Sequence, residues 1–252
     1  MPIDDAKRWL FYRFRPINEY LWQELELAEI FACEPDRLND PFDCQIDPKG
    51  SLRRAIKNTS DPKRAQVLQQ IAEEFERKDP REKQRGVCCF SLSPQSHLMW
   101  SHYADSHKGV CLLYDFPSDY FPQKYQHALN DQFYFVGCAK VDYGNNDYYE
   151  WLLNGDLDDP IPNEPVVCAA AKLLVTKAKC WEYEDEARIL VSKKGYIAYE
   201  KKFLKQVIFG LRTPNRQKAL IRSLLRKENP DVVFAQTVRD PESDFGLSFE
   251  DE

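Results

Sequence analysis

The chain has 252 residues, of which 43% are hydrophobic and 30% are charged, and its formal net charge is −6. This length is sufficient to bury a full core and favours one domain, while the negative charge disfavours general nucleic-acid binding. No run approaches the ~18 consecutive apolar residues of a membrane helix, and the start lacks the apolar core of a secretory signal. We expect a cytoplasmic protein that does not associate with membranes.

The aromatic and basic residues of the segment L-F-Y-R-F-R alternate from Phe11 onward, which is the period of a strand with one apolar face. Arg13 and Arg15 then project together from one face. Pro16 ends the strand, and Asn18 is a candidate N-cap for a short helix. The polar segment R-L-N-D-P-F-D that follows predicts a turn.

Two segments of opposite charge follow. Residues 51–85 hold ten Lys/Arg against six Asp/Glu, which we interpret as a solvated helical face, and apolar side chains recur at helical spacing over residues 62–78. Residues 142–164 hold seven Asp/Glu and no Lys/Arg. With its prolines and tyrosines, the stretch 142–165 predicts a long, partly ordered surface loop.

The other elements are mixed without strict βαβ alternation. We expect strands over residues 87–92, 110–114 and 187–192, a helix over 166–178, and a strand–helix–strand unit from 207 to 235. This pattern predicts an α+β fold with a central, mainly antiparallel sheet and flanking helices. The domain is expected to cover residues 1–238, and the acidic tail 239–252 is expected to be frayed.

The segment W-E-Y-E-D-E-A-R, Trp181 to Arg188, concentrates carboxylates beside aromatic rings and an arginine. If it is extended, Glu184, Glu186 and Arg188 share one face and two carboxylates point to one place. If it is helical, Glu184 and Arg188 form an ordinary surface pair. The apolar run I-L-V-S that follows favours a strand entrance, where reactive groups are commonly presented.

Known phosphate-binding and catalytic motifs are missing, since the sequence has no G-x-G-x-x-G, Walker loop, H-E-x-x-H or G-x-S-x-G. A phosphate ligand would be held mainly by arginines such as Arg13 and Arg15, whose alternative role is surface ion pairing. Ser91 and Ser93 share one strand face and either hold a ligand or satisfy the backbone at the strand end. The histidine and cysteine spacings do not suggest a metal site, and we expect no metal.

Four segments together resemble a bacterial family of unknown function, domain of unknown function 2971. They are Y-R-F-R, L-N-D-P-F-D, the pair C-F-S with M-W-S-H-Y-A-D-S-H-K-G-V-C-L, and W-E-Y-E-D-E-A-R, spread over residues 11–190. The order of an arginine strand, F-S-x-S and E-x-E is also similar to the arginine–serine–glutamate layout of ADP-ribosyltransferases. A clean S-T-S motif is missing, and two arginines compete for one role.

The similarity to ADP-ribosyltransferases implies an enzyme that uses NAD as its substrate and has an acceptor that the sequence does not identify. It implies that an arginine supports the bound NAD, that the serines brace the nicotinamide pocket, and that the second glutamate of E-x-E is catalytic. On this hypothesis Glu184 positions or deprotonates the acceptor, and Trp100 or Tyr103 stacks on the nicotinamide ring. Asn39 is a candidate substrate contact or an Asx turn. The candidate residues of this hypothesis are Arg13, Arg15, Asn39, Ser91, Ser93, Trp100, Tyr103, Glu184 and Glu186, of which the similarity itself assigns the arginines, serines and glutamates.

Two other classes of function compete with this hypothesis. A non-catalytic ligand-sensing or protein-interaction module would use the acidic loop and exposed aromatics, and predicts no cleft at Glu186. A metal-dependent nuclease or phosphoesterase would bring Asp40, Asp43, Glu184 and Glu186 together around a shared ion.

Overall fold

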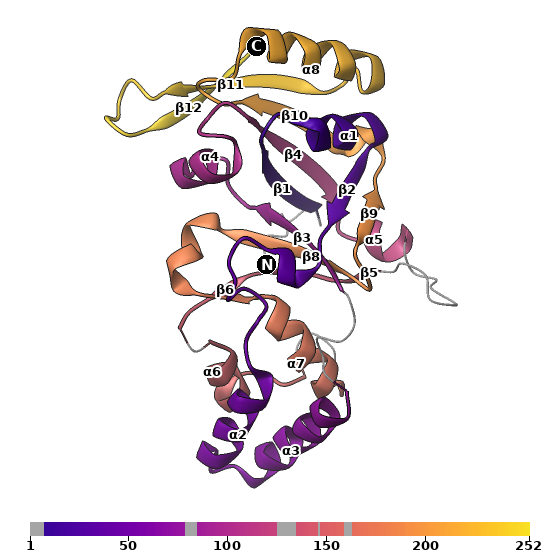
Figure 1. Cartoon of the computed structure of the whole chain (residues 1–252), viewed down its shortest axis with the longest axis vertical. Coiled ribbons are helices and arrows are strands. Elements are labelled where there is room, and N and C mark those ends of the chain that lie inside the picture. The colour runs from indigo at the N-terminus through magenta and orange to yellow at the C-terminus, as the bar shows by residue number, and fades with distance from the viewer. Residues whose placement is uncertain (1–7, 79–84, 125–134, 146, 159–162) are drawn as a thin grey trace.

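The structure, a computed structural model, describes the chain except for residues 1–7, 79–84, 125–134, 146 and 159–162. Its centre is an eight-stranded sheet that is antiparallel except between β10 and β11 (Figure 1). The sheet and its flanking helices confirm the α+β class. In sheet order the strands are β12 (Leu247–Asp251), β11 (Val233–Arg239), β10 (Leu204–Phe209), β4 (Val110–Pro117), β1 (Arg8–Arg15), β3 (Gly86–Ser91), β8 (Glu186–Val191) and β5 (Phe135–Lys140).

The sheet opens between β1 and β3. β1 pairs with β4 along its whole length, from Arg8↔Pro117 to Arg15↔Val110. In contrast, Tyr12↔Ser91 is the single register pair between the described residues of β1 and β3. Because β3 ends at Ser91, the described residues of β3 before it have no register pair with Arg13–Arg15, and side chains of both strands can line the space there.

The alternation of side chains along strand β1 places them on two faces, as its sequence predicts. Trp9 and Phe11 are buried in the main core, whereas Phe14, from the other face, packs edge-to-face on Trp100 with ring centroids 5.1 Å apart. Arg13 and Arg15 share the face of Phe11, because side chains alternate along a strand. The strand carries two arginines into a largely apolar environment.

The C-terminal strand–helix–strand unit is confirmed by β10, α8 (Asn215–Glu228) and β11, which pairs parallel to β10. α8 buries Ile221 and Leu225 against the main core. Beyond this unit, Leu247–Asp251 forms β12 on β11, in place of the frayed tail that we expect from the acidic composition. Alternation explains the difference, because Leu247 and Phe249 pack against a core cluster while Glu250, on the opposite face, is exposed.

Helices from two distant parts of the chain form a lobe at one end of the molecule (Figure 1). These are α2 (Pro48–Asn58), α3 (Pro62–Arg77), α6 (Asp147–Asn154) and α7 (Pro165–Leu174). They share a second apolar core, to which α3 contributes Leu68, Ile71 and Phe75. The expectation of one long loop over 142–165 is wrong, because α6 lies within it and buries Tyr148 and Leu152 in this core.

Shorter elements complete the structure. These elements are α1 (Glu19–Leu27), β2 (Glu29–Ala32), α4 (His97–Tyr103), α5 (Tyr120–Lys124), β6 (Asp142–Tyr143), β7 (Thr176–Lys177) and β9 (Gly195–Ala198), with 3-10 helices η1 (Pro35–Arg37), η2 (Lys179–Glu184) and η3 (Lys201–Phe203). Among all the described residues, no helix combines the length and the apolar character needed to cross a bilayer.

Gly109 provides a test of the packing beside the sheet opening. A Cβ at this position would lie 2.2 Å from the carbonyl oxygen of Arg15 and 2.9 Å from that of Ala104, and neither backbone atom can rotate away. We expect Gly109→Ala to lower the free energy of unfolding by about 1–3 kcal/mol, measured by urea denaturation. The matched control is Gly137→Ala on β5, where a Cβ meets no described atom within 4 Å. Equal effects of the two substitutions would contradict this packing.

Candidate functional site

A buried arginine organises the centre of the site. Arg188 lies on β8 with no exposed surface, and its guanidinium donates to both carboxylate oxygens of Asp43, from Nη1 at 2.9 Å and from Nη2 at 2.7 Å. Its Nε donates to Glu186 Oε1 at 2.8 Å, and Nη1 also donates to the carbonyl oxygen of Leu174 at 2.7 Å. Such bidentate, charge-assisted bonds fix the geometry of both carboxylates.

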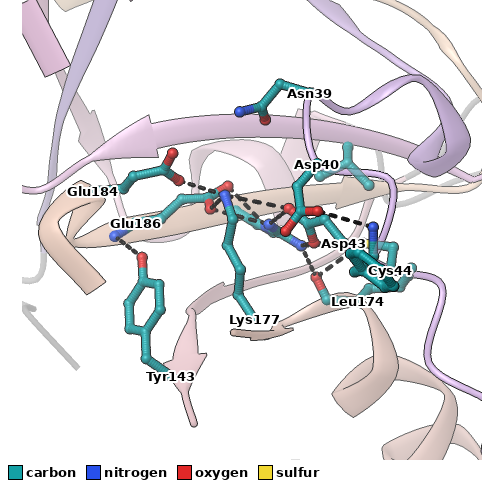
Figure 2. Close-up of polar contacts among 12 residues, drawn as sticks. Asn39, Asp40, Asp43, Cys44, Tyr143, Leu174, Lys177, Glu184 and Glu186 are labelled. Atoms are coloured by element: carbon teal, nitrogen blue, oxygen red, sulfur yellow. Dashed lines mark hydrogen bonds and ion pairs between the residues drawn. The ribbon is translucent and has the colours of Figure 1, made fainter. Parts of the chain in front are cut away.

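A buried lysine joins the same carboxylates from the other side. Lys177, on β7, places Nζ 3.1 Å from Glu186 Oε2 and 3.3 Å from Asp43 Oδ2, and it also pairs with Glu184. Figure 2 shows the lysine side chain rising between these acidic groups. We call Asp43, Lys177, Glu184, Glu186 and Arg188 the buried charge cluster. Its three carboxylates and two cations carry a formal charge of −1.

The two glutamates of the E-x-E motif differ in their pKa values. Burial acts to raise the pKa of Glu186, but Arg188 and Lys177 outweigh burial and lower this pKa to about 2. Burial also raises the pKa of Glu184, which stays above its ordinary value although Lys177 and the Tyr103 hydroxyl lower it. Glu186 is therefore a fixed anion, whereas Glu184 takes up a proton more readily, a division seen in acid–base sites.

The E-x-E motif begins in a helical turn and ends in a strand. Glu184 is the last residue of η2, Asp185 adopts a left-handed conformation with φ of 41°, and Glu186 begins β8. The Glu186 N–H donates to the Tyr143 hydroxyl at 2.8 Å, which is visible in Figure 2. With this kink at Asp185 between them, both glutamates contact Lys177.

A cleft of about 330 Å³ occupies the sheet opening. Its lining comes from β1 and β3, from β2 and the loop after it, from α4, and from β7, η2 and β8, which contribute Lys177, Glu184 and Glu186. Its volume lies at the lower end of the range for small-molecule sites. The lining residues are Tyr12, Arg13, Phe14, Arg15, Phe31, Cys33, Arg37, Leu38, Asn39, Asp43, Val87, Cys89, Phe90, Ser91, Met99, Tyr103, Lys177, Glu184 and Glu186.

The two sequence-predicted arginines both line this cleft. Arg13 Nε lies 3.4 Å from Glu24 Oε1, and Arg15 Nε lies 3.3 Å from Glu24 Oε2, so one carboxylate faces two guanidinium groups. Within the described part of the chain, Arg13 Nη1 is buried without a hydrogen-bond partner, and Arg15 Nε has only its ion-pair contact with Glu24, which is not a hydrogen bond. Burial and the adjacent Arg13 charge lower the pKa of Arg15. This wall carries a formal charge of +1 and has unused donors.

Tyr103 and Asn39 also line the cleft, and they connect to the glutamates. The Tyr103 hydroxyl donates to Glu184 Oε1 at 2.5 Å, and Asn39 Nδ2 donates to the Tyr103 oxygen at 2.7 Å. These two hydrogen bonds fix the position of the Tyr103 hydroxyl. The Asx turn considered for Asn39 is made by its neighbour Asp40, whose Oδ1 accepts the N–H of Phe42 at 3.0 Å.

The remaining sequence-predicted residues divide between the cleft and the structure around it. Ser91 lines the cleft, but its hydroxyl donates to the carbonyl oxygen of Ser93 at 2.9 Å, which satisfies the backbone at the strand end. Ser93 Oγ accepts the N–H of Gln95 at 3.2 Å. Trp100 has no exposed surface and donates from its indole nitrogen to the Pro94 carbonyl oxygen at 2.8 Å. Ser93 and Trp100 are outside the cleft lining.

Sequence reasoning missed Lys177 altogether and gave Arg188 and Tyr143 no role. One signal was available for Lys177, because it follows the apolar run L-L-V-T, where a lysine is expected to be buried and paired. Asp43 was considered only as a ligand for a metal ion. Its actual partner, Arg188, lies 145 residues away, and no local pattern connects the two.

The convergence of carboxylates matches one part of the nuclease hypothesis. Asp43, Glu184 and Glu186 do approach one another, but Lys177 and Arg188 lie between them. Within the described ranges, no group of three His, Cys, Asp or Glu side chains is arranged to hold a metal ion. A cleft at Glu186, by contrast, is a feature that the pure interaction-module hypothesis does not predict.

One family model matches part of the chain. Residues 99–189 match a family model described as "Protein of unknown function (DUF2971)". The matched segment runs from α4 to β8, so it contains Tyr103 and all of the buried charge cluster except Asp43. No curated protein and no solved structure shows a significant match to the chain. The similarity to DUF2971 supports a domain of unknown function.

We expect Arg188→Met to destabilise the protein by roughly 3–5 kcal/mol, because it leaves the buried carboxylates of Asp43 and Glu186 without their main partner. Chemical denaturation measures this change. The control is Arg8→Met, which removes a partly exposed pair with Asp115 and should cost about 1 kcal/mol or less. A loss no larger than that of the control would mean that the buried charge cluster does not depend on Arg188.

The low pKa of Glu186 predicts a pH dependence of stability. The folded-state pKa is about 2 and the ordinary value is 4.5, so ionised Glu186 stabilises the fold above pH 4.5. This contribution, on the order of 3 kcal/mol, is lost as the pH falls from 4.5 toward 2. We expect Glu186→Gln to reduce this acid sensitivity, measured as the difference in unfolding free energy between the two proteins across this range. Parallel pH curves would contradict the assignment.

Proposed function

We propose that this protein is an ADP-ribosyltransferase-like enzyme that binds NAD and cleaves its nicotinamide–ribose bond. The observation that supports this proposal is the opposite charge of the two walls of one cleft: guanidinium groups from β1 and carboxylates from η2 and β8. NAD carries anionic phosphates and a cationic pyridinium ring. A ligand with this distribution of charge complements both walls at once.

The arginine wall is suited to the pyrophosphate. Among the described residues, Arg13 Nη1 is a buried donor without a hydrogen-bond partner and Arg15 Nε has only an ion-pair contact with Glu24, and buried donors are costly unless a ligand satisfies them. The single carboxylate of Glu24 leaves an excess positive charge beside them. A bound phosphate would accept these hydrogen bonds and relieve the repulsion between the two guanidinium groups.

The carboxylate wall is suited to the reacting sugar. In the proposed step the bond between C1′ and the nicotinamide nitrogen breaks, and its electron pair leaves with neutral nicotinamide. Positive charge builds on the ribose, as in glycoside hydrolysis, and ionised Glu186 would stabilise it. Arg188 and Lys177 hold this carboxylate in place.

Glu184 would complete the reaction as the base. The acceptor oxygen forms the new bond to C1′ and gives its proton to Glu184, whose raised pKa suits proton uptake. Tyr103 orients the carboxylate by donating to its Oε1. If the acceptor is water, the products are nicotinamide, ADP-ribose and one proton.

A second candidate function is nucleotide binding without cleavage. Glu186 already has both carboxylate oxygens engaged, Oε1 by Arg188 and Oε2 by Lys177 and Arg188, so less of its charge is available to a developing cation. This saturation is the observation that favours a sensor. A sensor would bind NAD in the same cleft and release no nicotinamide.

Nicotinamide release from NAD tests the proposal, over a range of candidate acceptors. We expect the wild-type protein to release nicotinamide and Glu186→Gln to lower the rate constant by about 100-fold or more, because the charge that stabilises the transition state is removed. The matched control is Glu182→Gln, an exposed glutamate in the same segment, which should retain full activity. Thermal unfolding of both variants separates a loss of chemistry from a loss of fold.

Other results have distinct meanings. NAD binding without release by the wild type, measured by calorimetry, would favour the sensor. Equal release by the wild type and Glu186→Gln would remove Glu186 from the mechanism. If the wild-type protein neither binds NAD nor releases nicotinamide, the proposed function is overturned.

A further inference from the structure

We propose that Phe31 and Tyr196 form a stacking platform for the adenine base at the mouth of the cleft. This inference rests on the proposed function and deepens it, because it assigns the half of the dinucleotide that the charged walls do not contact. Phe31 lines the cleft together with Arg13 and Arg15. Tyr196 extends the same aromatic surface outward from it.

The platform is built on the two-stranded ribbon of β2 and β9. Phe31 and Tyr196 are direct cross-strand partners, and their ring centroids lie 5.0 Å apart with an interplanar angle of 59°. Their neighbours Ile30 and Ile197 point the other way into the main core. The ribbon is therefore anchored by its apolar face, which holds the two rings at a fixed position on the surface.

Both rings are more exposed than a packing role requires. Phe31 is 42% exposed and Tyr196 is 46% exposed, although each is large enough to stabilise the fold if it were buried. The cross-strand contact between them stabilises the ribbon. The outer surface of the pair remains open to a planar ligand.

The size of the cleft explains why a platform outside it is needed. A volume of about 330 Å³ is at the small end of ligand sites and suits one nucleotide of NAD rather than two. If the nicotinamide ribose lies against Glu184 and Glu186 and the pyrophosphate lies against the arginines, the adenosine half extends through the mouth. Phe31 lies on that path because it lines the cleft beside the arginine wall.

The chemistry of the mouth suits a nucleobase. Stacking of a base on an aromatic ring strengthens binding and needs no specific hydrogen bonds. Arg37 lines the same cleft with a side chain that is 73% exposed, although its Nε also pairs with Glu34 Oε2 at 3.3 Å. The platform thus predicts a preference for a dinucleotide over a mononucleotide.

The experiment compares NAD with nicotinamide mononucleotide, which lacks the adenosine half. We expect Phe31→Ala to raise KM for NAD by roughly tenfold, the equivalent of about 1.4 kcal/mol, with kcat unchanged. KM for the mononucleotide should not change. Tyr196→Ala should act in the same direction, and Phe31→Trp should retain the wild-type KM. The matched control is Tyr20→Ala, because Tyr20 is 59% exposed and lies on α1 outside the cleft lining.

A binding measurement keeps this inference separate from the proposed function. AMP titration of the wild type and Phe31→Ala by calorimetry tests the platform even if neither substrate is cleaved. Weaker AMP binding by the variant than by Tyr20→Ala supports the platform. Equal binding by the two variants, no AMP binding by the wild type, or a rise in KM for the mononucleotide equal to that for NAD would overturn it.

Discussion

The buried pairing of Arg188 with Asp43 and Glu186 is the interaction on which the rest of the site depends. Removing an arginine from water has a large desolvation cost, which is offset only when its donors meet well-placed acceptors. Arg188 meets this condition with two carboxylates and the Leu174 carbonyl oxygen. The pairing thereby fixes the position of β8 relative to the loop after η1 and to the end of α7.

The opening of the sheet at Tyr12↔Ser91 has a complementary role. A continuous hydrogen-bonded ladder between β1 and β3 would leave no cleft between the arginines of β1 and the glutamates of η2 and β8. With a single register pair, the strands stay in one sheet while their side chains line a common cleft. Separated charges of opposite sign therefore face a shared volume without neutralising one another directly.

Much of the architecture follows from local pattern. The alternation from Phe11, the Asn18 cap and the strand–helix–strand at the C-terminus can be predicted, because each depends on neighbouring residues. The site could be predicted only in part. The sequence shows the charged residues of the cleft beside aromatic side chains, namely Arg13, Arg15, Glu184 and Glu186. The pairing of the two glutamates with Lys177, and of Lys177 with Asp43, depends on how the chain folds and is not visible in the sequence. The helix α6 was missed because its acidic composition hides the spacing of its buried residues.

The segment from Leu174 to Lys177 limits how this protein can be divided. Leu174 ends α7 in the helical lobe and contributes a carbonyl oxygen to Arg188, and Lys177 follows only three positions later. The lobe has its own apolar core and resembles an appendage in outline (Figure 1). Cutting it away would nevertheless remove the Leu174 carbonyl oxygen that Arg188 uses and cut the chain three positions before Lys177, so the sheet alone is not a minimal functional fragment. A cut between the lobe and the sheet would therefore pass through the contacts of the buried charge cluster.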